Sequence, residues 1–219
     1  PPLPQLPQPA AAPADEFARA IGDGMVAVDV RSAEAFAGGN VPTSYSMPLD
    51  MLGAVAGMFL PYGKPLGLVV ETPSQVEPAV RMLARLGYDE VHAYLSGGMH
   101  DWETSGRPYN TVGIVYIRDV ERRLAGQEQF TLLDVRSAEE FRAAHLEGAQ
   151  NIYFGELPNK LDQVASNGVV TTFCGSGQRA MVAASVLRRH GIEAVEDCLG
   201  SMAACQNVQC DVVEEGAGS

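Results

Sequence analysis

Cysteine is missing from most of this 219-residue chain, because Cys174, Cys198, Cys205 and Cys210 all lie in its last quarter. A disulfide framework would spread cysteines over the whole sequence, so this pattern argues against a disulfide-stabilised secreted fold and favours reduced thiols in a cytoplasmic protein. The cysteines and the four scattered histidines also form no Cys-x-x-Cys pair and no cluster with the spacing of a zinc site. We therefore expect neither a metal nor another cofactor.

Basic charge is also scarce, because 15 Lys and Arg residues against 27 Asp and Glu residues give a formal net charge of −12. Nucleic acids and anionic membranes are bound through basic surfaces, so neither is an expected partner. Residues 51–60 form an apolar run, but Pro61 stops it far short of the roughly 20 residues that span a bilayer. An initiator Met and a signal segment are missing as well, which favours a processed chain or an excised fragment.

What the sequence does contain is a Pro-rich start, residues 1–13, which predicts an extended linker that follows another segment. After it, the chain repeats itself. Three pairs of segments match: residues 28–36 with 133–141, residues 83–87 with 187–191, and residues 97–99 with 200–202. The offset drifts from 105 to 103 residues, as loop insertions between two copies of one domain produce. The sequence predicts two domains, residues 14–110 and 111–219.

Each copy alternates short β-branched runs with helical patterns. In the second copy, residues 131–135 and 168–173 predict strands, and residues 179–190 predict a helix with one apolar face that ends at Gly191. The first copy repeats this order and ends its helix at Gly87. Alternating strands and helices predict an α/β fold in which helices cover both faces of a parallel sheet.

The candidate chemistry lies in one loop of the second copy, Cys174, Gly175, Ser176, Gly177, Gln178 and Arg179. The loop joins a strand to a helix and so lies at the carboxyl end of the sheet, where open α/β sheets bind ligands. Two glycines allow the backbone amides to turn inward, and the helix N-terminus and Arg179 add positive charge. We expect an anion-binding cradle that favours a thiolate nucleophile. A lone cysteine is more often a small buried residue, but such a residue needs no glycine-rich turn.

The motifs of the second copy resemble the signatures of the rhodanese family. They are Asp134-Val135-Arg136, Glu140-Phe141, His145-Leu146-Glu147-Gly148-Ala149, Asn151-Ile152 and the loop that begins at Cys174. The resemblance covers nearly all of residues 15–210, once per copy. It implies a five-stranded parallel sheet in each domain and a sulfurtransferase whose cysteine carries a sulfane sulfur as a persulfide. The Cys-x4-Arg spacing matches the sulfur-transferring branch, whereas related phosphatases use Cys-x5-Arg.

This resemblance assigns catalysis to Cys174 and Arg179. The expected substrate-binding residues are 175–178 together with Asp134 and Arg136. Asp134 is expected to orient backbone amides, while Arg136 is either a second anion contact or part of an ion pair at a helix start.

Two departures from the family pattern concern the second copy, where residues 200–205 replace Gly-Gly-x-x-x-Trp and Ala144 replaces a glycine. The first copy keeps the Gly-Gly-x-x-x-Trp pattern at residues 97–102 but lacks the nucleophile. Counting along the sequence places Val70 and Gln75 at the positions of Cys174 and Arg179. We expect this copy to be a structural or docking partner.

The two copies together resemble the C-terminal part of a known fusion. Residues 58–65, 87–91 and 94–98 are similar to the inactive domain between a metallo-β-lactamase-fold module and an active rhodanese in persulfide dioxygenase fusions. The iron-binding His-x-His-x-Asp-His motif of such enzymes is absent from this sequence. The resemblance implies that an N-terminal module of that fold is a partner and that the dioxygenase activity lies outside this chain.

The leading hypothesis is a sulfurtransferase that moves sulfur from thiosulfate or a glutathione persulfide to a thiol, cyanide or sulfite. A non-catalytic interaction module of a larger sulfide-oxidising enzyme is the alternative, and an arsenate reductase or phosphatase is disfavoured by loop length. Cys198, Cys205 and Cys210 could resolve a persulfide on Cys174, but packing roles for Cys198 and Cys205 and a loose tail thiol at Cys210 are the simpler interpretation.

Overall fold

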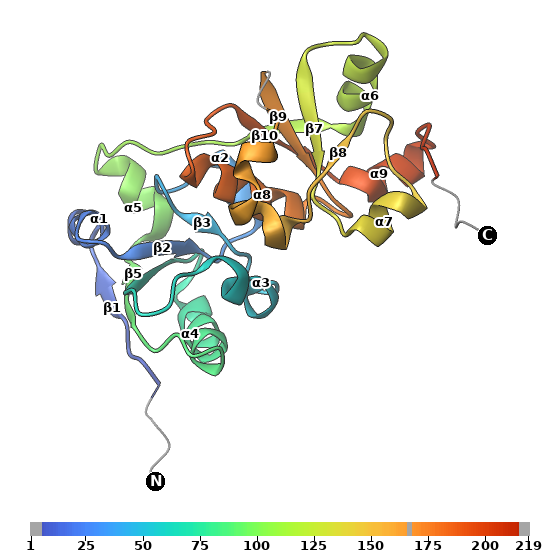
Figure 1. Ribbon diagram of the computed structural model, residues 1–219. Helices are drawn as coiled ribbons and strands as arrows, with labels where there is room; N and C mark the ends of the chain where they lie inside the picture. Colours follow the sequence, from blue (N-terminus) through green and yellow to red (C-terminus); the bar gives the residue numbers. More distant parts are fainter. Residues whose placement is uncertain (1–5, 166–167, 215–219) are drawn as a thin grey trace. The chain divides into compact units, whose positions relative to one another are not determined.

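The computed structural model describes residues 6–165 and 168–214, and the chain divides into two compact units, Pro1–Thr111 and Val112–Ser219 (Figure 1). Each unit contains one five-stranded sheet whose strand pairs are all parallel. This confirms the predicted α/β class with a parallel five-stranded sheet in each domain.

The first domain has the strand order β1-β5-β4-β2-β3. Its strands are β1 (Ala10–Ala12), β2 (Val26–Asp29), β3 (Tyr45–Ser46), β4 (Leu66–Val69) and β5 (Val91–Leu95). Its helices are α1 (Ala14–Gly22), α2 (Ala33–Gly38), α3 (Leu52–Phe59), α4 (Val76–Arg85) and α5 (Gly98–Thr104), with the 3-10 turn η1 (Pro73–Gln75) before α4.

Strand β1 corrects one prediction, because residues 10–12 were expected to belong to the Pro-rich linker. They pair with β5 instead, with Ala10 opposite Ala93 and Ala12 opposite Leu95. An edge strand tolerates prolines on either side of it, and here Pro9 and Pro13 flank three alanines. The remaining linker is therefore no longer than residues 1–9, of which residues 1–5 lie outside the described part of the chain.

The second domain repeats this order as β6-β10-β9-β7-β8. Its strands are β6 (Gly113–Tyr116), β7 (Phe130–Asp134), β8 (Gln150–Asn151), β9 (Val169–Phe173) and β10 (Val195–Leu199). Its helices are α6 (Ile117–Ala125), α7 (Ala138–Ala143), α8 (Gln178–Arg189) and α9 (Ser201–Val208), with the 3-10 turns η2 (Phe154–Asn159) and η3 (Leu161–Gln163).

Helix α8 differs from its prediction in one respect. The sequence predicts a helix with a single apolar face, but every residue from 180 to 187 is buried, including Ser185. A helix buried on all sides packs more tightly than an amphipathic surface helix. The start of α8, which follows the candidate loop, is therefore firmly fixed.

Register fixes which positions of the two domains correspond. In the second domain Asp134 lies opposite Phe173, the last residue of β9, and in the first domain Asp29 lies opposite Val69, the last residue of β4. The residue after each of these central strands is therefore equivalent. The register thus aligns Val70 with Cys174, as counting along the sequence does.

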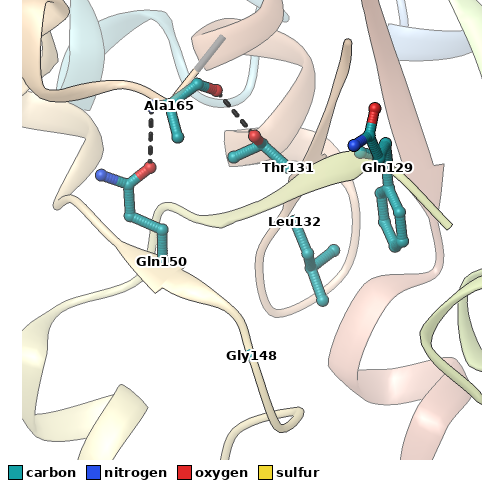
Figure 2. Close-up of a pocket in the computed structure, with 7 residues that line it drawn as sticks. Gln129, Thr131, Leu132, Gly148, Gln150 and Ala165 are labelled. Carbon is teal, nitrogen blue, oxygen red and sulfur yellow. Dashed lines mark hydrogen bonds between the residues drawn. The ribbon is translucent and has the colours of Figure 1, made fainter. Parts of the chain in front are cut away.

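A surface pocket of about 610 Å³ opens at the amino end of β7 (Figure 2). Gln129, Thr131, Gln150 and Ala165 are among its lining residues, and Ala165 is held there by a hydrogen bond from Thr131 Oγ1 (2.6 Å) and by one to Gln150 Oε1 (3.2 Å). Parallel strands end at the same edge of a sheet, so this pocket lies at the opposite end from the loop after β9. It contains none of the predicted site residues.

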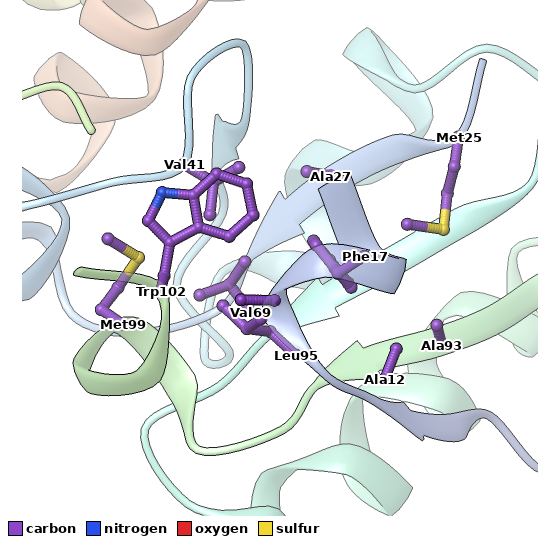
Figure 3. Packing of buried hydrophobic residues seen from close by; sticks show 11 residues of the cluster. Ala12, Phe17, Met25, Ala27, Val41, Val69, Ala93, Leu95, Met99 and Trp102 are labelled. Atoms are coloured by element: carbon purple, nitrogen blue, oxygen red, sulfur yellow. The ribbon is translucent and has the colours of Figure 1, made fainter. Parts of the chain in front are cut away.

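The core of the first domain is a cluster in which Phe17 of α1 and Met99 and Trp102 of α5 pack on the sheet (Figure 3). Alternate residues of the same strands, Val28 and Leu68 among them, are also fully buried, so both faces of the sheet are covered. Within the described part of the chain, no helix combines the length and the apolar composition that a membrane crossing requires.

Candidate active site

The Cys174 thiol lies fully buried directly after β9, at the start of the candidate loop. The backbone N–H of Gly177 donates to Cys174 Sγ at 3.1 Å. Gly177 has φ +100°, a backbone conformation that favours glycine, and a Cβ there would lie in a tight contact of 3.3 Å with the backbone nitrogen of Gly200. This amide is directed at the sulfur and lies close to the start of α8, so it is placed to stabilise negative charge that develops on sulfur during a displacement. This geometry suits a cysteine nucleophile.

Arg179 is fixed above the loop by an ion pair. Its two terminal nitrogens donate to the Glu140 carboxylate at 2.9 and 2.7 Å, and Nη2 lies so close to Gly175 that a Cβ there would be 3.1 Å from it. Glu140 is held in turn by the N–H of Ser137, with which it forms the capping box of α7. The Arg179 guanidinium lowers the pKa of Glu140 to about 2. Glu140 is therefore a carboxylate at neutral pH and sets the position of Arg179.

Two side chains of the loop face solvent. Ser176 and Gln178 are exposed, whereas Gly175 and Arg179 are half-buried and Gly177 is buried. A donor molecule would therefore approach past Ser176 and Gln178. Substrate binding by residues 175–178 stays a prediction.

Asp134 and Arg136 form a buried pair of their own. Arg136 Nε lies 2.9 Å from Asp134 Oδ1, and Arg136 Nη2 lies 2.5 Å from Asp134 Oδ2 and 2.8 Å from the carbonyl oxygen of Ala144. The side chains are 5% and 0% exposed, so neither presents its charge to a ligand. Of the two roles left open for Arg136, the structure shows the ion pair before a helix.

The same pair recurs in the domain that lacks the cysteine. Arg31 Nε lies 2.9 Å from Asp29 Oδ1, and Arg31 Nη2 lies 2.6 Å from Asp29 Oδ2 and 2.7 Å from the carbonyl oxygen of Gly39. An arrangement present with and without the nucleophile belongs to the fold. The pair therefore fixes the segment that leads to α7 and Glu140, and a substrate-binding role for Asp134 and Arg136 stays a prediction.

Ser201 is a residue that the sequence interpretation missed. Its Oγ accepts a hydrogen bond from the Cys174 N–H at 3.0 Å and donates one to the Cys198 carbonyl at 2.7 Å. The side chain is fully buried, and the backbone has φ +42°, a conformation that costs a non-glycine residue about 1–2 kcal/mol. The signal was available, because a serine stands where the first domain has Gly98.

Helix α9, which begins at Ser201, also holds the loop through its backbone. The N–H of Met202 donates to the Cys174 carbonyl at 3.0 Å, and the N–H of Ala203 donates to the Gly175 carbonyl at 2.8 Å. These bonds satisfy two loop carbonyls and two of the amides that a helix start leaves unpaired. The segment that departs from the family pattern is thus the support of the loop.

The corresponding loop of the first domain is closed by its own side chain. Gln75 Oε1 accepts hydrogen bonds from the backbone N–H groups of Glu71 (2.7 Å) and Thr72 (3.4 Å). Val70 takes the place of the nucleophile and is buried. The amides that would face an anion in a cradle are therefore already bonded within the loop. The negative charge of the exposed Glu71 beside them also repels an anion.

The other three cysteines share one apolar cluster with Phe173 and Met202. Cys198 packs inside β10, where burial raises its pKa to about 12, and Cys205 stands at the position of Trp102 in the first domain. These two agree with the packing interpretation. Cys210 does not, because it is only half-exposed, packs against this cluster and donates its backbone N–H to the Cys205 carbonyl at 3.0 Å, so the prediction of a loose tail thiol is wrong.

No group of three or more His, Cys, Asp or Glu side chains suited to a metal ion occurs among residues 6–165 and 168–214.

Comparison with known proteins supplies a family. The family model described as Rhodanese-like domain matches residues 13–105 and again residues 117–207. The chain is 25% identical over 111 residues to the candidate sulfur carrier protein YrkF of Bacillus subtilis (strain 168), covering 51% of this chain and 58% of that protein. It is 30% identical over 76 residues to the uncharacterized protein YqhL of the same organism, covering 35% of this chain and 60% of that protein.

The chain thus spans less than two thirds of the length of these curated relatives. Among solved structures, a thiosulfate sulfurtransferase from Pseudomonas aeruginosa is 18% identical and aligns over 96% of this chain and 45% of its own, with a TM-score of 0.44.

Proposed function

The chain belongs to the rhodanese-like family, and from this premise we propose that its second domain is a sulfurtransferase that carries a sulfane sulfur on Cys174 as a persulfide. The observation that carries the proposal is the hydrogen bond from the Gly177 N–H to Cys174 Sγ, under an Arg179 guanidinium that Glu140 holds in place. A family fold alone does not imply activity, but this loop has a nucleophile, an amide aimed at it and a fixed cation.

The reaction is a double displacement without net oxidation. In the first step the Cys174 thiolate attacks the outer sulfur of the donor, a new S–S bond forms, and the S–S bond of the donor breaks to release sulfite or a thiolate. In the second step an acceptor attacks the outer sulfur of the Cys174 persulfide, and that S–S bond breaks to return the thiolate. The Gly177 amide and the start of α8 stabilise negative charge on sulfur in both steps.

Thiosulfate or a glutathione persulfide is the proposed donor, and a thiol, cyanide or sulfite is the proposed acceptor. The proposal places the reaction in the cytoplasm, which the four free thiols support. It also includes a metallo-β-lactamase-fold module as a partner outside this chain, with no nucleic acid or membrane involved.

The first domain has a different proposed role. Its loop amides are taken up by Gln75, and the nucleophile position is Val70. These features support a docking or structural function for that domain. They are also compatible with the alternative hypothesis, in which the whole chain is a non-catalytic module of a larger sulfide-oxidising enzyme.

The test is the intact mass of the chain after brief incubation with thiosulfate or with glutathione persulfide. Wild type should gain the mass of one sulfur atom and lose it again when cyanide is added, whereas Cys174→Ser should gain nothing. If neither donor adds sulfur to the wild-type chain, the sulfurtransferase proposal is wrong and the interaction module becomes the better account.

A further inference from the structure

The end of α9 brings two thiols together. The helix closes with Gln209 in the left-handed conformation at φ +57°, the Cys210 N–H donates to the Cys205 carbonyl at 3.0 Å, and the Gln209 N–H donates to the Gln206 carbonyl at 3.3 Å. These two bonds define a Schellman motif, in which the side chains at the two outer positions touch. Here those positions are Cys205 and Cys210, and both side chains belong to the same apolar cluster.

Space for this contact comes from a difference between the two domains. The first domain fills the equivalent of position 205 with Trp102, whose indole N–H donates to the Pro108 carbonyl at 3.0 Å. Cysteine is far smaller than tryptophan, so at the end of α9 the chain can fold Cys210 back against the apolar cluster that holds Cys205. One large side chain is replaced by two thiols.

The segment after Cys210 is anchored as well. Val213 and His145 exchange two backbone hydrogen bonds, of 2.8 and 2.9 Å, in an antiparallel bridge. Cys210 is therefore tied down by α9 on one side and by this bridge on the other. The two thiols are held close by the backbone and do not depend on a chance encounter of a free tail.

We infer that Cys205 and Cys210 are a redox-active dithiol, which a low-molecular-weight disulfide such as glutathione disulfide converts to an intramolecular disulfide. Cys210 is the half-exposed thiol and reacts first, forming a mixed disulfide with one half of the oxidant and releasing the other half as a thiol. Cys205, which is 1% exposed, then attacks Cys210 Sγ and releases the second thiol. The two protein thiols lose two electrons and two protons, and the oxidant gains them.

Burial raises the pKa of both thiols, and the Glu121 carboxylate beside Cys210 adds to the shift. The thiolate fraction is therefore small, and exchange is slower than for a fully exposed thiol.

The position of the two thiols connects the proposed disulfide with the candidate loop. The disulfide would close the carboxyl end of the helix whose first turn bonds the backbone of Cys174 and Gly175 through the Met202 and Ala203 amides. This inference does not depend on sulfur transfer, because it concerns two thiols outside the candidate loop.

The experiment uses the full chain with Cys174→Ser, so that the nucleophile takes no part, and measures intact mass after prolonged incubation with glutathione disulfide. The expected result is the loss of the mass of two hydrogen atoms without a retained glutathione, reversed by a reductant. Adding Cys210→Ser should abolish the loss, and because this residue is half-exposed the substitution spares the core. Adding Cys205→Ser should leave one glutathione on Cys210.

A matched control is Cys198→Ser in the same background, since Cys198 shares the cluster but lies inside β10. This variant should still lose the two hydrogen atoms. The inference is overturned if Cys174→Ser keeps all its hydrogen atoms, if it retains glutathione as a stable adduct, or if Cys198→Ser abolishes the loss.

Discussion

The two domains share their scaffold and differ in their loops. Strand order, the register of the central pairs β2–β4 and β7–β9, and the buried Asp–Arg pair are the same in both. Three positions change together, because Cys174, Arg179 and Glu140 correspond to Val70, Gln75 and Ala35. The nucleophile, the cation and the carboxylate that fixes the cation are thus one unit, present or absent as a set.

The comparison also shows how a rhodanese-like loop is closed without an anion. Backbone amides that turn inward need an acceptor. In the first domain Gln75 supplies this acceptor from within the loop. Substitutions that make the second domain resemble the first therefore test which differences matter, and their effects should decrease in the following order.

The largest effect is expected from Cys174→Val, which installs the residue of the first domain. Transfer should fall to the uncatalysed rate, because no other thiol lies in the loop. Thiocyanate formed from thiosulfate and cyanide measures it, and circular dichroism checks the fold. If this variant retains transfer activity, another cysteine must be the nucleophile.

The shared ion pair should matter equally in both domains. Removing one partner of a buried pair leaves an uncompensated charge and costs about 3–5 kcal/mol. Arg31→Ala and Arg136→Ala should each lower the free energy of unfolding of their own domain by that amount, as measured by urea unfolding. If only Arg136→Ala lowers the free energy of unfolding, Arg136 has a role that is specific to the second domain.

Arg179→Gln copies the glutamine of the first domain and removes the fixed cation. Loss of a single charge-stabilising donor in a site costs roughly 10²–10³-fold in rate, and we expect kcat/KM for transfer to fall within that range. Arg142→Gln, an exposed residue on α7, is the matched control and should change the rate little. Equal losses for both variants would point to net charge rather than position.

Two substitutions at Ser201 distinguish a role in positioning Cys174 from a role in stability. Ser201→Ala and Ser201→Gly both remove the hydroxyl, but only glycine relieves the strain of the positive φ. A hydrogen bond contributes about 0.5–1.5 kcal/mol, so both variants should lose roughly three- to tenfold in kcat, with the KM for the donor unchanged. Ser201→Gly should nevertheless be more stable than Ser201→Ala by about 1 kcal/mol. If kcat instead follows stability, Ser201 has only a structural role.

The smallest effect is a pH dependence of stability. The pKa of Glu140 is lowered to about 2 from an ordinary 4.5, so its contribution is complete above pH 4.5 and is lost as the pH falls towards 2. The stability difference between wild type and Glu140→Gln should shrink over that interval in urea unfolding. Glu139→Gln, its exposed neighbour, should show no such trend.

Much of this architecture was predictable, because the repeat fixes the equivalence of the domains and the Cys-x4-Arg loop is a local pattern. Strand β1 was not, since three alanines between prolines carry neither alternation nor β-branched residues. Its place depends on hydrogen bonds to β5, which lies about 80 residues later in the chain.

The site was predictable only where its geometry is local. Cys174 and Arg179 occupy one turn, but the partner of Arg179 is 39 residues away at Glu140 and the support of Cys174 is 27 residues away at Ser201. For Arg136 the motif left an anion contact and an ion pair both open, because a motif marks residues that recur, not what they contact. Likewise, the contact of Cys210 with Cys205 depends on how α9 ends, which spacing alone does not specify.

The repeat also creates a hazard during folding. Residues 28–36 and 133–141 give the ends of β2 and β7, and the segments that lead from them into α2 and α7, nearly the same sequence, and tandem copies can misassemble by pairing with the wrong neighbour. Their partners β4 and β9 are not interchangeable. Thr171 of β9 donates to Glu196 Oε1 at 2.6 Å, whereas the equivalent Gly67 of β4 has no room for a Cβ against Met25 and Phe17. If β9 took the place of β4, its Thr171 hydroxyl would lose Glu196 and its side chain would clash with Met25 and Phe17. The differences between β4 and β9 therefore disfavour pairing between the two domains.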